Sequence, residues 1–310
     1  MSLERSSRST LCAVEIDLNE DLYFTTRQGQ RHHLVVTKAW ADVHESTLSE
    51  AGVAQRGAHT VVRAHINLTL DGVPISLIRW IGSDRSFADP YRLGNLMLWF
   101  DANTDIFRFL NEDHGSCRPR KAVRLALWEA DQRICPTLLH PWCPLPDDGL
   151  RISDCYDSDD CWMGAYHGAD AHGGLDINHP AGTTLYTPFA VQRQWLFNAV
   201  ARGDANNRWR GECDWPDGST WAIQSHHLIQ VMNPEQQPLL AGQAYAHTAG
   251  MYNGMYEHSH FVFAVKGPED EEEIRLDPWL LFRQMLVDRR GMIATRHSGG
   301  HLLRSDPPLS

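Results

Sequence analysis

The stretch HGGLD, residues 172–176, places two metal-binding side chain types four positions apart. Histidine and aspartate both bind zinc, and a catalytic zinc site takes three protein ligands and a water. Gly173 and Gly174 disfavour a helix by about 1 kcal/mol each. They favour a turn that enters a strand at LDI and lets both side chains reach one ion. The sequence therefore predicts half of a metal site, with at least one further ligand elsewhere in the chain.

The best source of that ligand is EHSHFVFAV, residues 257–265. Its aromatic and β-branched residues are typical of a buried strand. Side chains two apart in a strand point to the same side, so His258 and His260 are expected to face one place. One ring would bind the metal while the other lies beside it.

A third histidine segment is WAIQSHHLIQV, residues 221–231, which is also strand-like. His226 and His227 are adjacent in it. Neighbouring residues of a regular strand face opposite sides, so we expect only one of the two rings to face the site. The pattern alone leaves open which one.

Composition excludes several functions. The chain has 310 residues, 42% of them hydrophobic, which suits two domains with a core in each. A net charge of −11 with no basic stripe argues against nucleic-acid binding. No apolar run is long enough to span a bilayer. The first residues, MSLERSSRSTLCAVEIDL, lack a sustained apolar stretch and do not make a convincing signal peptide.

Seven cysteines give a further expectation. No CxxC pair occurs, which argues against a thiolate zinc site. Six of the seven fall between residues 117 and 213, in a loop-rich region. This cluster predicts disulfides and an oxidising compartment, with buried thiols as the alternative.

The N-terminal region, residues 1–145, reads as β-rich. VVRAHINLTL alternates apolar and polar residues, and VPISLIRW follows it after Asp71-Gly72, which predicts a hairpin over residues 61–80. The short runs LMLWF, DIFRFL and AVRLALWEA are expected to be further strands. A sandwich or curled sheet of unknown role is predicted here.

A proline-rich connector, residues 135–149, leads to a second strand-rich unit. An acidic loop, GPEDEEE, precedes the best helix in the chain, LDPWLLFRQMLVDRRG, with Asp277 as its cap and Pro278 in its first turn. The predicted fold class is therefore mainly β with a short C-terminal helix. The predicted domains are residues 1–145, residues 146–282, and the end of the helix with a loose tail over 283–310.

Taken together, residues 165–282 resemble the lysostaphin-like family of zinc metallopeptidases, which cut peptide bonds in bacterial peptidoglycan. The family's histidine and aspartate, followed by a "GTPVYAP"-like strand, are matched by His172, Asp176 and GTTLYTP. Its "YAHL"-like segment is matched by SHHL, and its "V..G..V..GQ.I" stretch by QVMNPEQQPLLAGQAYA. Its "HLHFE" is matched by HSHFV, with DP at 277–278 soon after. Four segments in the family's order are more specific than any one of them.

The resemblance implies an antiparallel β-sheet metallopeptidase domain and assigns its site residues. By it, His172, Asp176 and His260 hold Zn²⁺, and His258 and His227 are the catalytic histidines. Two departures stand out: Val262 replaces the family's glutamate, which is not a ligand there, and the segment over 189–220 is longer and rich in tryptophan.

The function expected from this resemblance is zinc-dependent hydrolysis of peptide bonds in peptidoglycan cross-links or stem peptides. Such an enzyme acts outside the cytoplasm, in the periplasm or after secretion, on peptidoglycan or another peptide. Two alternatives remain: a non-catalytic wall-binding or activator protein on the same fold, and a zinc peptidase with a protein substrate outside the wall.

Overall fold

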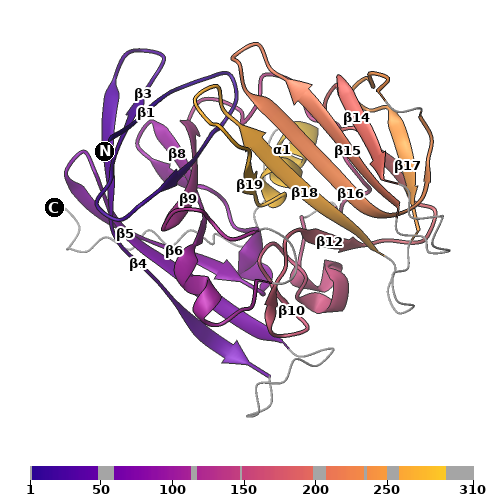
Figure 1. Cartoon of the computed structure of the whole chain (residues 1–310), viewed down its shortest axis with the longest axis horizontal. Helices are drawn as coiled ribbons and strands as arrows, with labels where there is room; N and C mark the ends of the chain where they lie inside the picture. The colour runs from indigo at the N-terminus through magenta and orange to yellow at the C-terminus, as the bar shows by residue number, and fades with distance from the viewer. Residues whose placement is uncertain are drawn as a thin grey trace. The chain divides into compact units, whose positions relative to one another are not determined.

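The computed structural model is dominated by β-strands, which confirms the predicted fold class (Figure 1). By their internal contacts the described residues fall into two units. Unit 1 runs to Pro136 and includes Gly164–Ala171, and unit 2 comprises Thr137–Met163 and the residues from His172 onward. The structure describes residues 2–47, 59–112, 117–146, 149–197, 207–233, 236–249 and 258–290. Among these residues no helix has the length and apolar character needed to cross a membrane.

The described part of unit 1 contains three sheets: a five-stranded one in the order β1-β3-β4-β5-β6, a four-stranded one in the order β2-β9-β8-β7, and the two-stranded pair β10-β11. The predicted hairpin is confirmed: β5 pairs with β6 through a turn in which Asp71 and Gly72 have φ of 53° and 80°. This turn matches the twist of the flanking strands. The strands of unit 1 are β1 (Ser2–Ser6), β2 (Cys12–Ile16), β3 (Asp21–Thr25), β4 (Arg31–Ser46), β5 (Thr60–Leu70), β6 (Val73–Ile81), β7 (Tyr91–Leu93), β8 (Leu96–Asn103), β9 (Val123–Glu129), β10 (Ala165–Tyr166) and β11 (Asp170–Ala171).

One strand prediction in unit 1 is wrong. The run DIFRFL contributes to a 3₁₀-helix, η2 (Thr104–Arg108), and not to a strand. Its buried residues Ile106 and Leu110 are four apart, which is a helical spacing, while Phe109 is exposed. The Asp105 carboxylate accepts a hydrogen bond from the backbone N–H of Ala41 and so holds the turn in place.

Unit 2 is built on an eight-stranded sheet with a main path β12-β18-β16-β15-β14, to which β13, β17 and β19 add at the sides (Figure 1). All pairings in this sheet are antiparallel. The elements of unit 2 are β12 (Leu175–Asn178), β13 (Thr184–Tyr186), β14 (Arg193–Phe197), β15 (Asn207–Asp214), β16 (Thr220–Val231), β17 (Ala244–Thr248), β18 (His258–Lys266), β19 (Ile274–Leu276) and the helix α1 (Trp279–Arg290).

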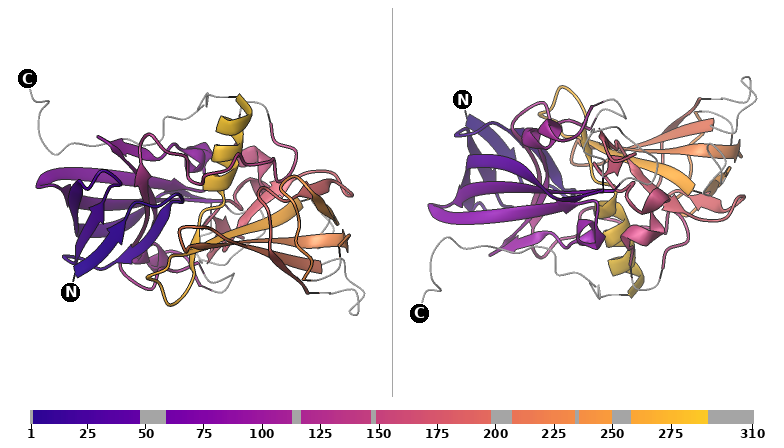
Figure 2. Two further views of the ribbon diagram at one scale, coloured as in Figure 1. Left: turned by 90° about the horizontal axis from the view of Figure 1, so that it is seen from above. Right: turned by 90° about the horizontal axis from the view of Figure 1, so that it is seen from below.

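The two faces of this sheet have different roles. The helix α1 lies on one side of this sheet (Figure 2). Odd-numbered residues of β18 point to that side: the ring of Phe261 lies 5.3 Å from that of Phe282 and 4.6 Å from that of Trp142. The predicted helix is confirmed, because the Trp279 N–H donates to the Asp277 carboxylate. Even-numbered residues of β16 and β18 therefore point to the opposite side. We call that side the histidine face, since it carries His226, His258 and His260.

The prediction of disulfides is wrong in this structure. All seven cysteines lie within the described residues, all are buried, and no disulfide joins any two of them. They pack as small apolar side chains in the two cores. Burial raises the pKa of the Cys143 and Cys155 thiols well above the ordinary value.

Candidate metal centre

The register of three strands brings the predicted ligands together. Asp176 of β12 lies directly opposite His260 of β18, and His226 of β16 lies opposite His260 on its other side. His258 lies opposite Asn178 in the same ladder. Directly opposed residues of antiparallel strands share a face. The sheet therefore places Asp176, His260 and His226 in one row across three strands.

His172 completes a compact donor group with Asp176 and His260. Its Nε2 lies 3.1 Å from His260 Nδ1, which in turn lies 2.8 Å from Asp176 Oδ1. The third separation, from His172 Nε2 to Asp176 Oδ1, is 3.5 Å. Zinc bonds of about 2.0–2.2 Å in a tetrahedron imply ligand atoms about 3.3–3.6 Å apart. The three donor atoms lie within about half an ångström of the spacing around a zinc ion.

Proton counting also favours a cation at this point. His260 Nδ1 faces both an imidazole nitrogen and a carboxylate oxygen. One N–H can point well at only one of them, whereas a cation between them satisfies all three donors. All three side chains are buried, His172 and Asp176 almost completely. Two neutral imidazoles and one carboxylate form a donor set that fits zinc.

The backbone around His172 fixes this geometry. The Met163 N–H donates to the carbonyl of His172, and the Asp176 N–H donates to the carbonyl of Asp160. His172 Nδ1 lies 3.4 Å from the carbonyl oxygen of Cys161. A ligand histidine generally donates its second N–H to such an acceptor, which orients the ring.

Gly174 leaves room for the ring of His260. A Cβ atom at this position would lie 2.3 Å from His260 Cε1 and 2.8 Å from the Phe261 carbonyl oxygen. No side chain can occupy that space without moving the ligand ring. The glycine is therefore required here by close approach.

A second group lies on the other side of the same carboxylate. Asp176 Oδ2 is 3.4 Å from His258 Nε2, and the rings of His258 and His227 are 4.8 Å apart. Donor atoms of Asp176, His227 and His258 also lie within metal-binding range of one another. Tyr156 stacks on His258 with ring centroids 4.2 Å apart and fixes that ring from below.

The prediction that only one of His226 and His227 faces the site is wrong, because β16 is irregular there. Pairing with β15 runs from Trp209–Ser225 to Asn207–Leu228, so two residues of β16 oppose only Arg208. Such a β-bulge breaks the alternation of side chains. His227 has φ of 60°, and both rings turn toward the centre. The His226 ring stacks on His260 at 4.6 Å, and the His227 ring lies 6.2 Å from it.

The electrostatics of the cluster favour an ionised Asp176 beside neutral His226 and His227 rings. Burial alone would raise the pKa of Asp176, but the facing histidines outweigh it and hold that pKa well below the ordinary value. Burial lowers the pKa of His226 and His227 well below the ordinary value. Burial also raises the pKa of Asp159, to about 8, and that of Asp160. The Asp176 carboxylate also contributes to the rise for Asp160, which lies behind it.

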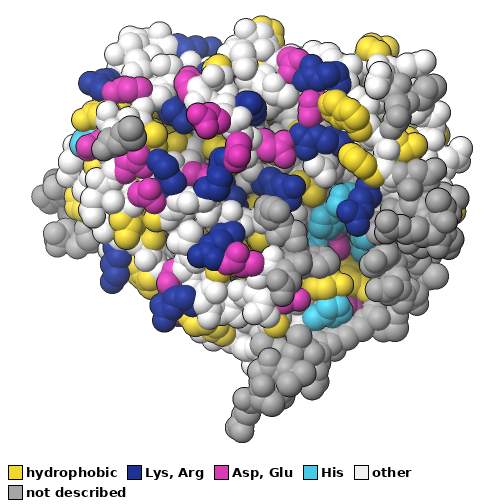
Figure 3. Space-filling view, viewed as in Figure 1, with side chains coloured by type: hydrophobic (Ala, Val, Ile, Leu, Met, Phe, Trp, Pro, Cys, Tyr) yellow, Lys and Arg dark blue, Asp and Glu magenta, His cyan; other side chains and the backbone are white. Residues whose placement is uncertain are grey.

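Several contributors lie outside the sequence prediction. The carbonyls of Cys161 and Asp160 and the ring of Tyr156 support the ligands, and YDSDDCW carries no pattern that would predict this. Gly174 lies within the predicted motif, where its role was assigned to the turn alone. In Figure 3, histidine side chains gather with an acidic one on the face that is shown.

Comparison with known proteins gives a weak likeness. No family model matches the sequence, and no curated protein matches it. Among solved structures, the catalytic domain of lysostaphin from Staphylococcus simulans is 18% identical over 38% of this chain and 81% of its own, with a TM-score of 0.28. A zinc-containing peptidase from Vibrio cholerae is 12% identical over 87% of this chain and 84% of its own, with a TM-score of 0.27.

A third similar structure is Csd3 from Helicobacter pylori, 12% identical over 79% of this chain and 60% of its own, with a TM-score of 0.29. All three TM-scores lie below 0.5 and all three identities below 25%. Likeness at this level assigns no activity to the chain. Its chemistry must be inferred from the centre itself.

Proposed function

We propose that this protein is a zinc-dependent endopeptidase of the lysostaphin-like type. The observation that carries the proposal is the convergence of His172, Asp176 and His260 on one point, with two further imidazoles beside it. Three protein donors leave a fourth position for water or substrate, which is the arrangement of catalytic zinc sites. The ordered motifs of the sequence support the same conclusion.

The proposed ligands are His172, Asp176 and His260. When bound there, zinc polarises the scissile carbonyl and lowers the pKa of water from near 16 towards roughly 7. One carboxylate and two neutral imidazoles leave a net charge of about +1, which preserves the Lewis acidity. The low pKa of Asp176 keeps its carboxylate ionised at neutral pH.

His258 and His227 are the proposed catalytic residues. His258 Nε2 lies 3.4 Å from Asp176 Oδ2, and Tyr156 holds the ring by stacking. In this position the imidazole can accept the proton of the attacking water and later transfer it to the leaving amine. His227 lies on the bulge of β16 and can donate an N–H to the oxygen of the carbonyl under attack.

The proposed substrate is the peptide of bacterial peptidoglycan, in its cross-links or stem peptides. This follows from the resemblance of residues 165–282 and implies action outside the cytoplasm. On this proposal residues 146–282 form the peptidase domain and residues 1–145 an accessory domain, while residues 291–310 of the predicted tail lie outside the described part of the chain.

The direct test is digestion of purified bacterial sacculi with and without a chelator, followed by mass analysis of the released fragments. We expect about one zinc per chain and release of peptide fragments that stops on chelation and resumes when zinc is restored. Zinc binding without release of fragments would favour the non-catalytic alternative. Cleavage of other proteins but not of sacculi would favour a zinc peptidase with a protein substrate outside the wall.

Variants separate binding from turnover. His260→Ala should abolish zinc binding and activity together. His258→Ala should retain zinc and lower kcat by at least about 100-fold, the usual contribution of a general base. His247→Ala is the matched control, because His247 is half-buried on β17 beside Thr184 and lies outside both donor groups. A His258→Ala variant with normal kcat would remove its proposed role.

A further inference from the structure

Arg208 occupies the position opposite the bulge of β16. It lies between Asn207 and Trp209 on β15, where the partner strand presents His226 and His227. A residue opposite a bulge faces the two bulged residues. The Arg208 side chain is exposed. Because it is exposed and lies across from His226 and His227, we place it at the edge of the metal centre.

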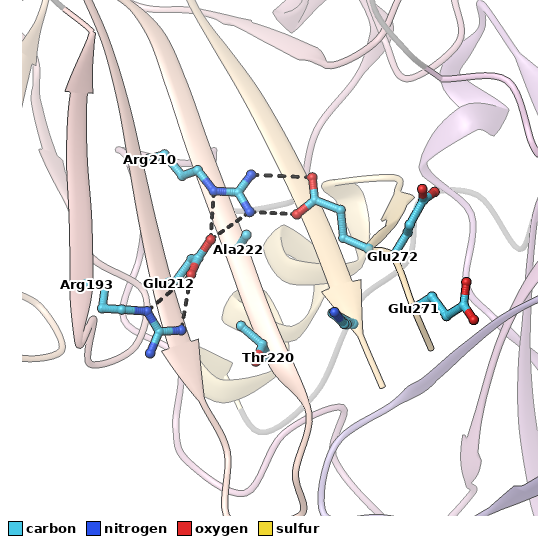
Figure 4. A pocket seen from close by; sticks show the side chains of 9 residues that line it. Arg193, Arg210, Glu212, Thr220, Ala222, Glu271 and Glu272 are labelled. Carbon is cyan, nitrogen blue, oxygen red and sulfur yellow. Dashed lines mark hydrogen bonds and ion pairs between the residues drawn. The ribbon is translucent and has the colours of Figure 1, made fainter. Parts of the chain in front are cut away.

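Arg208 differs from the next arginine on the same strand and side. Arg210 makes paired contacts, with its guanidinium 2.6 Å from Glu273 and 2.8 Å from Glu212 (Figure 4). Arg208 has neither an ion pair nor a hydrogen bond from its side chain to any residue that the structure describes. Its positive charge is thus not neutralised within the described part of unit 2.

The Arg208 guanidinium lies close to the metal centre. Arg208 lies across from His226 and His227, and the His226 ring stacks on that of His260 with centroids 4.6 Å apart. An unneutralised guanidinium beside an open metal position attracts anionic groups of whatever occupies that position.

We propose that Arg208 is a specificity-determining residue that binds a carboxylate of the substrate close to the bond that is cut. This inference rests on the proposed peptidase function. A guanidinium binds a carboxylate through two parallel N–H bonds, so the interaction selects both charge and geometry. The enzyme would accordingly prefer peptides that carry a free carboxylate near the scissile bond.

The spacing of the sheet sets how near that carboxylate lies. Arg208 is two strands from His260, which corresponds to about 10 Å at roughly 4.8 Å per strand. An extended peptide advances about 3.4 Å per residue, so the carboxylate belongs within roughly three residues of the scissile bond. Either an α-carboxylate at the chain end or an acidic side chain meets that condition.

The test compares three peptides of equal length: tetraalanine with a free C-terminal carboxylate, its C-terminal amide, and the amide with one internal alanine replaced by glutamate. We expect wild-type protein to show a KM at least about tenfold lower for a carboxylate peptide than for the amide. Preference for the first peptide shows that Arg208 binds an α-carboxylate. Preference for the third shows that it binds an acidic side chain.

The matched variants are Arg208→Gln and Arg210→Gln, which remove one guanidinium each from the same side of the same strand. Arg208→Gln should abolish the preference by raising KM for the carboxylate peptide, with kcat and the KM of the amide little changed. Arg210→Gln should retain the preference. Arg208→Lys should restore only part of it, because an ammonium lacks the bidentate geometry.

A binding measurement keeps this inference separate from the peptidase proposal. Fluorescence anisotropy with the same labelled peptides and zinc-free protein reports affinity without turnover. Tighter binding of a carboxylate peptide that disappears in Arg208→Gln supports the inference even if no peptide is cleaved. Equal affinity for all three peptides, or a preference unchanged in Arg208→Gln, overturns it while leaving the metal centre intact.

Discussion

Two ends of the histidine face use the same strands for different purposes. At one end β16 and β18 present His226, His258 and His260. At the other end β14, β15, β16 and β18, with the loop before β19, surround a pocket of about 510 Å³ lined mainly by charged side chains (Figure 4). Both ends are rich in ionisable groups, and they differ in how opposite charges are paired.

At the charged end, cations and anions alternate across the strands. Arg193 bonds Glu212 at 3.1 Å and Asp214 at 2.8 Å, while Arg210 bridges Glu212 and Glu273. Each guanidinium has carboxylates within hydrogen-bond distance. Opposite charges on neighbouring strands stabilise a sheet by tenths of a kcal/mol per pair. This end has the character of a structural surface.

At the histidine end, nitrogen atoms of several rings converge on one carboxylate. Asp176 is the one carboxylate among His172, His258 and His260, and its two oxygens serve different rings. Burying such a group is costly unless something completes it. The two ends therefore differ in kind: one carries paired opposite charges, and the other gathers metal-binding side chain types around one carboxylate.

The largest expected effect tests this contrast directly. His260→Ala should lower zinc affinity by more than about 100-fold, because losing a ligand costs more than losing a group that supports one. Glu212→Gln, at the charged end, should leave zinc affinity unchanged. Zinc content and competition with a chelator measure both. Equal losses in the two variants would show that the two ends are not distinct.

Gly174→Ala should have the next largest effect. The added methyl group would meet the His260 ring and the Phe261 carbonyl at distances that require movement. We expect at least about tenfold weaker zinc binding, as for other changes that misplace a ligand. The free energy of unfolding should fall as well, since the methyl group overpacks a buried site.

Gly182→Ala provides the control for that substitution. Gly182 has φ of 75° and open space around it, so alanine there strains the backbone without touching the centre. It should lower the free energy of unfolding by about 1 kcal/mol, with normal zinc binding. Normal zinc binding in Gly174→Ala would contradict the role assigned to that glycine.

His227→Gly should separate stability from activity. A side chain at φ of 60° costs about 1 kcal/mol, and glycine removes that cost. We expect unchanged or higher thermal stability, retained zinc, and loss of most turnover. Thermal unfolding and assays of peptide cleavage measure the two properties. A marked loss of stability would mean that the ring supports the fold and not the reaction.

The sequence predicted most of what alternation and spacing can reveal. His258 and His260 share a side because a strand has a period of two, and the Asp71-Gly72 turn follows from residues that accept positive φ. The pairing of Asp176 with His260 came from the family resemblance. Its geometric basis, the register of β12 on β18, is a long-range property that no local pattern encodes.

The failures have equally specific causes. The bulge of β16 depends on pairing with β15, so the adjacent His226 and His227 gave no sign that both would face the centre. The cysteine cluster predicted disulfides, but burial of each thiol in a core satisfies the same composition. The importance of Arg208 depends on the absence of a carboxylate partner among the described residues, which only coordinates can reveal.

The smallest expected effect concerns the charged end. The Arg193 guanidinium is the main cause that lowers the pKa of Asp214 from 3.8 to about 2. Because the folded value is lower than the ordinary one, this pair stabilises the fold above about pH 4, and its contribution is lost as the pH falls towards 2. Both side chains are nearly half exposed, so the pair should contribute at most about 1 kcal/mol at neutral pH.

Arg193→Gln should therefore move the titration midpoint of Asp214 upward, towards 3.8, as followed by carboxyl carbon shifts in nuclear magnetic resonance. Zinc affinity should not change, and the free energy of unfolding at neutral pH should fall only slightly. Lys266→Gln, at the same pocket, is the control and should leave the Asp214 midpoint near 2. If Arg193→Gln altered zinc affinity, charge at one end of the face would influence the other. The face would then act as one electrostatic unit, and the neutralised arginines would belong to the functional surface together with Arg208.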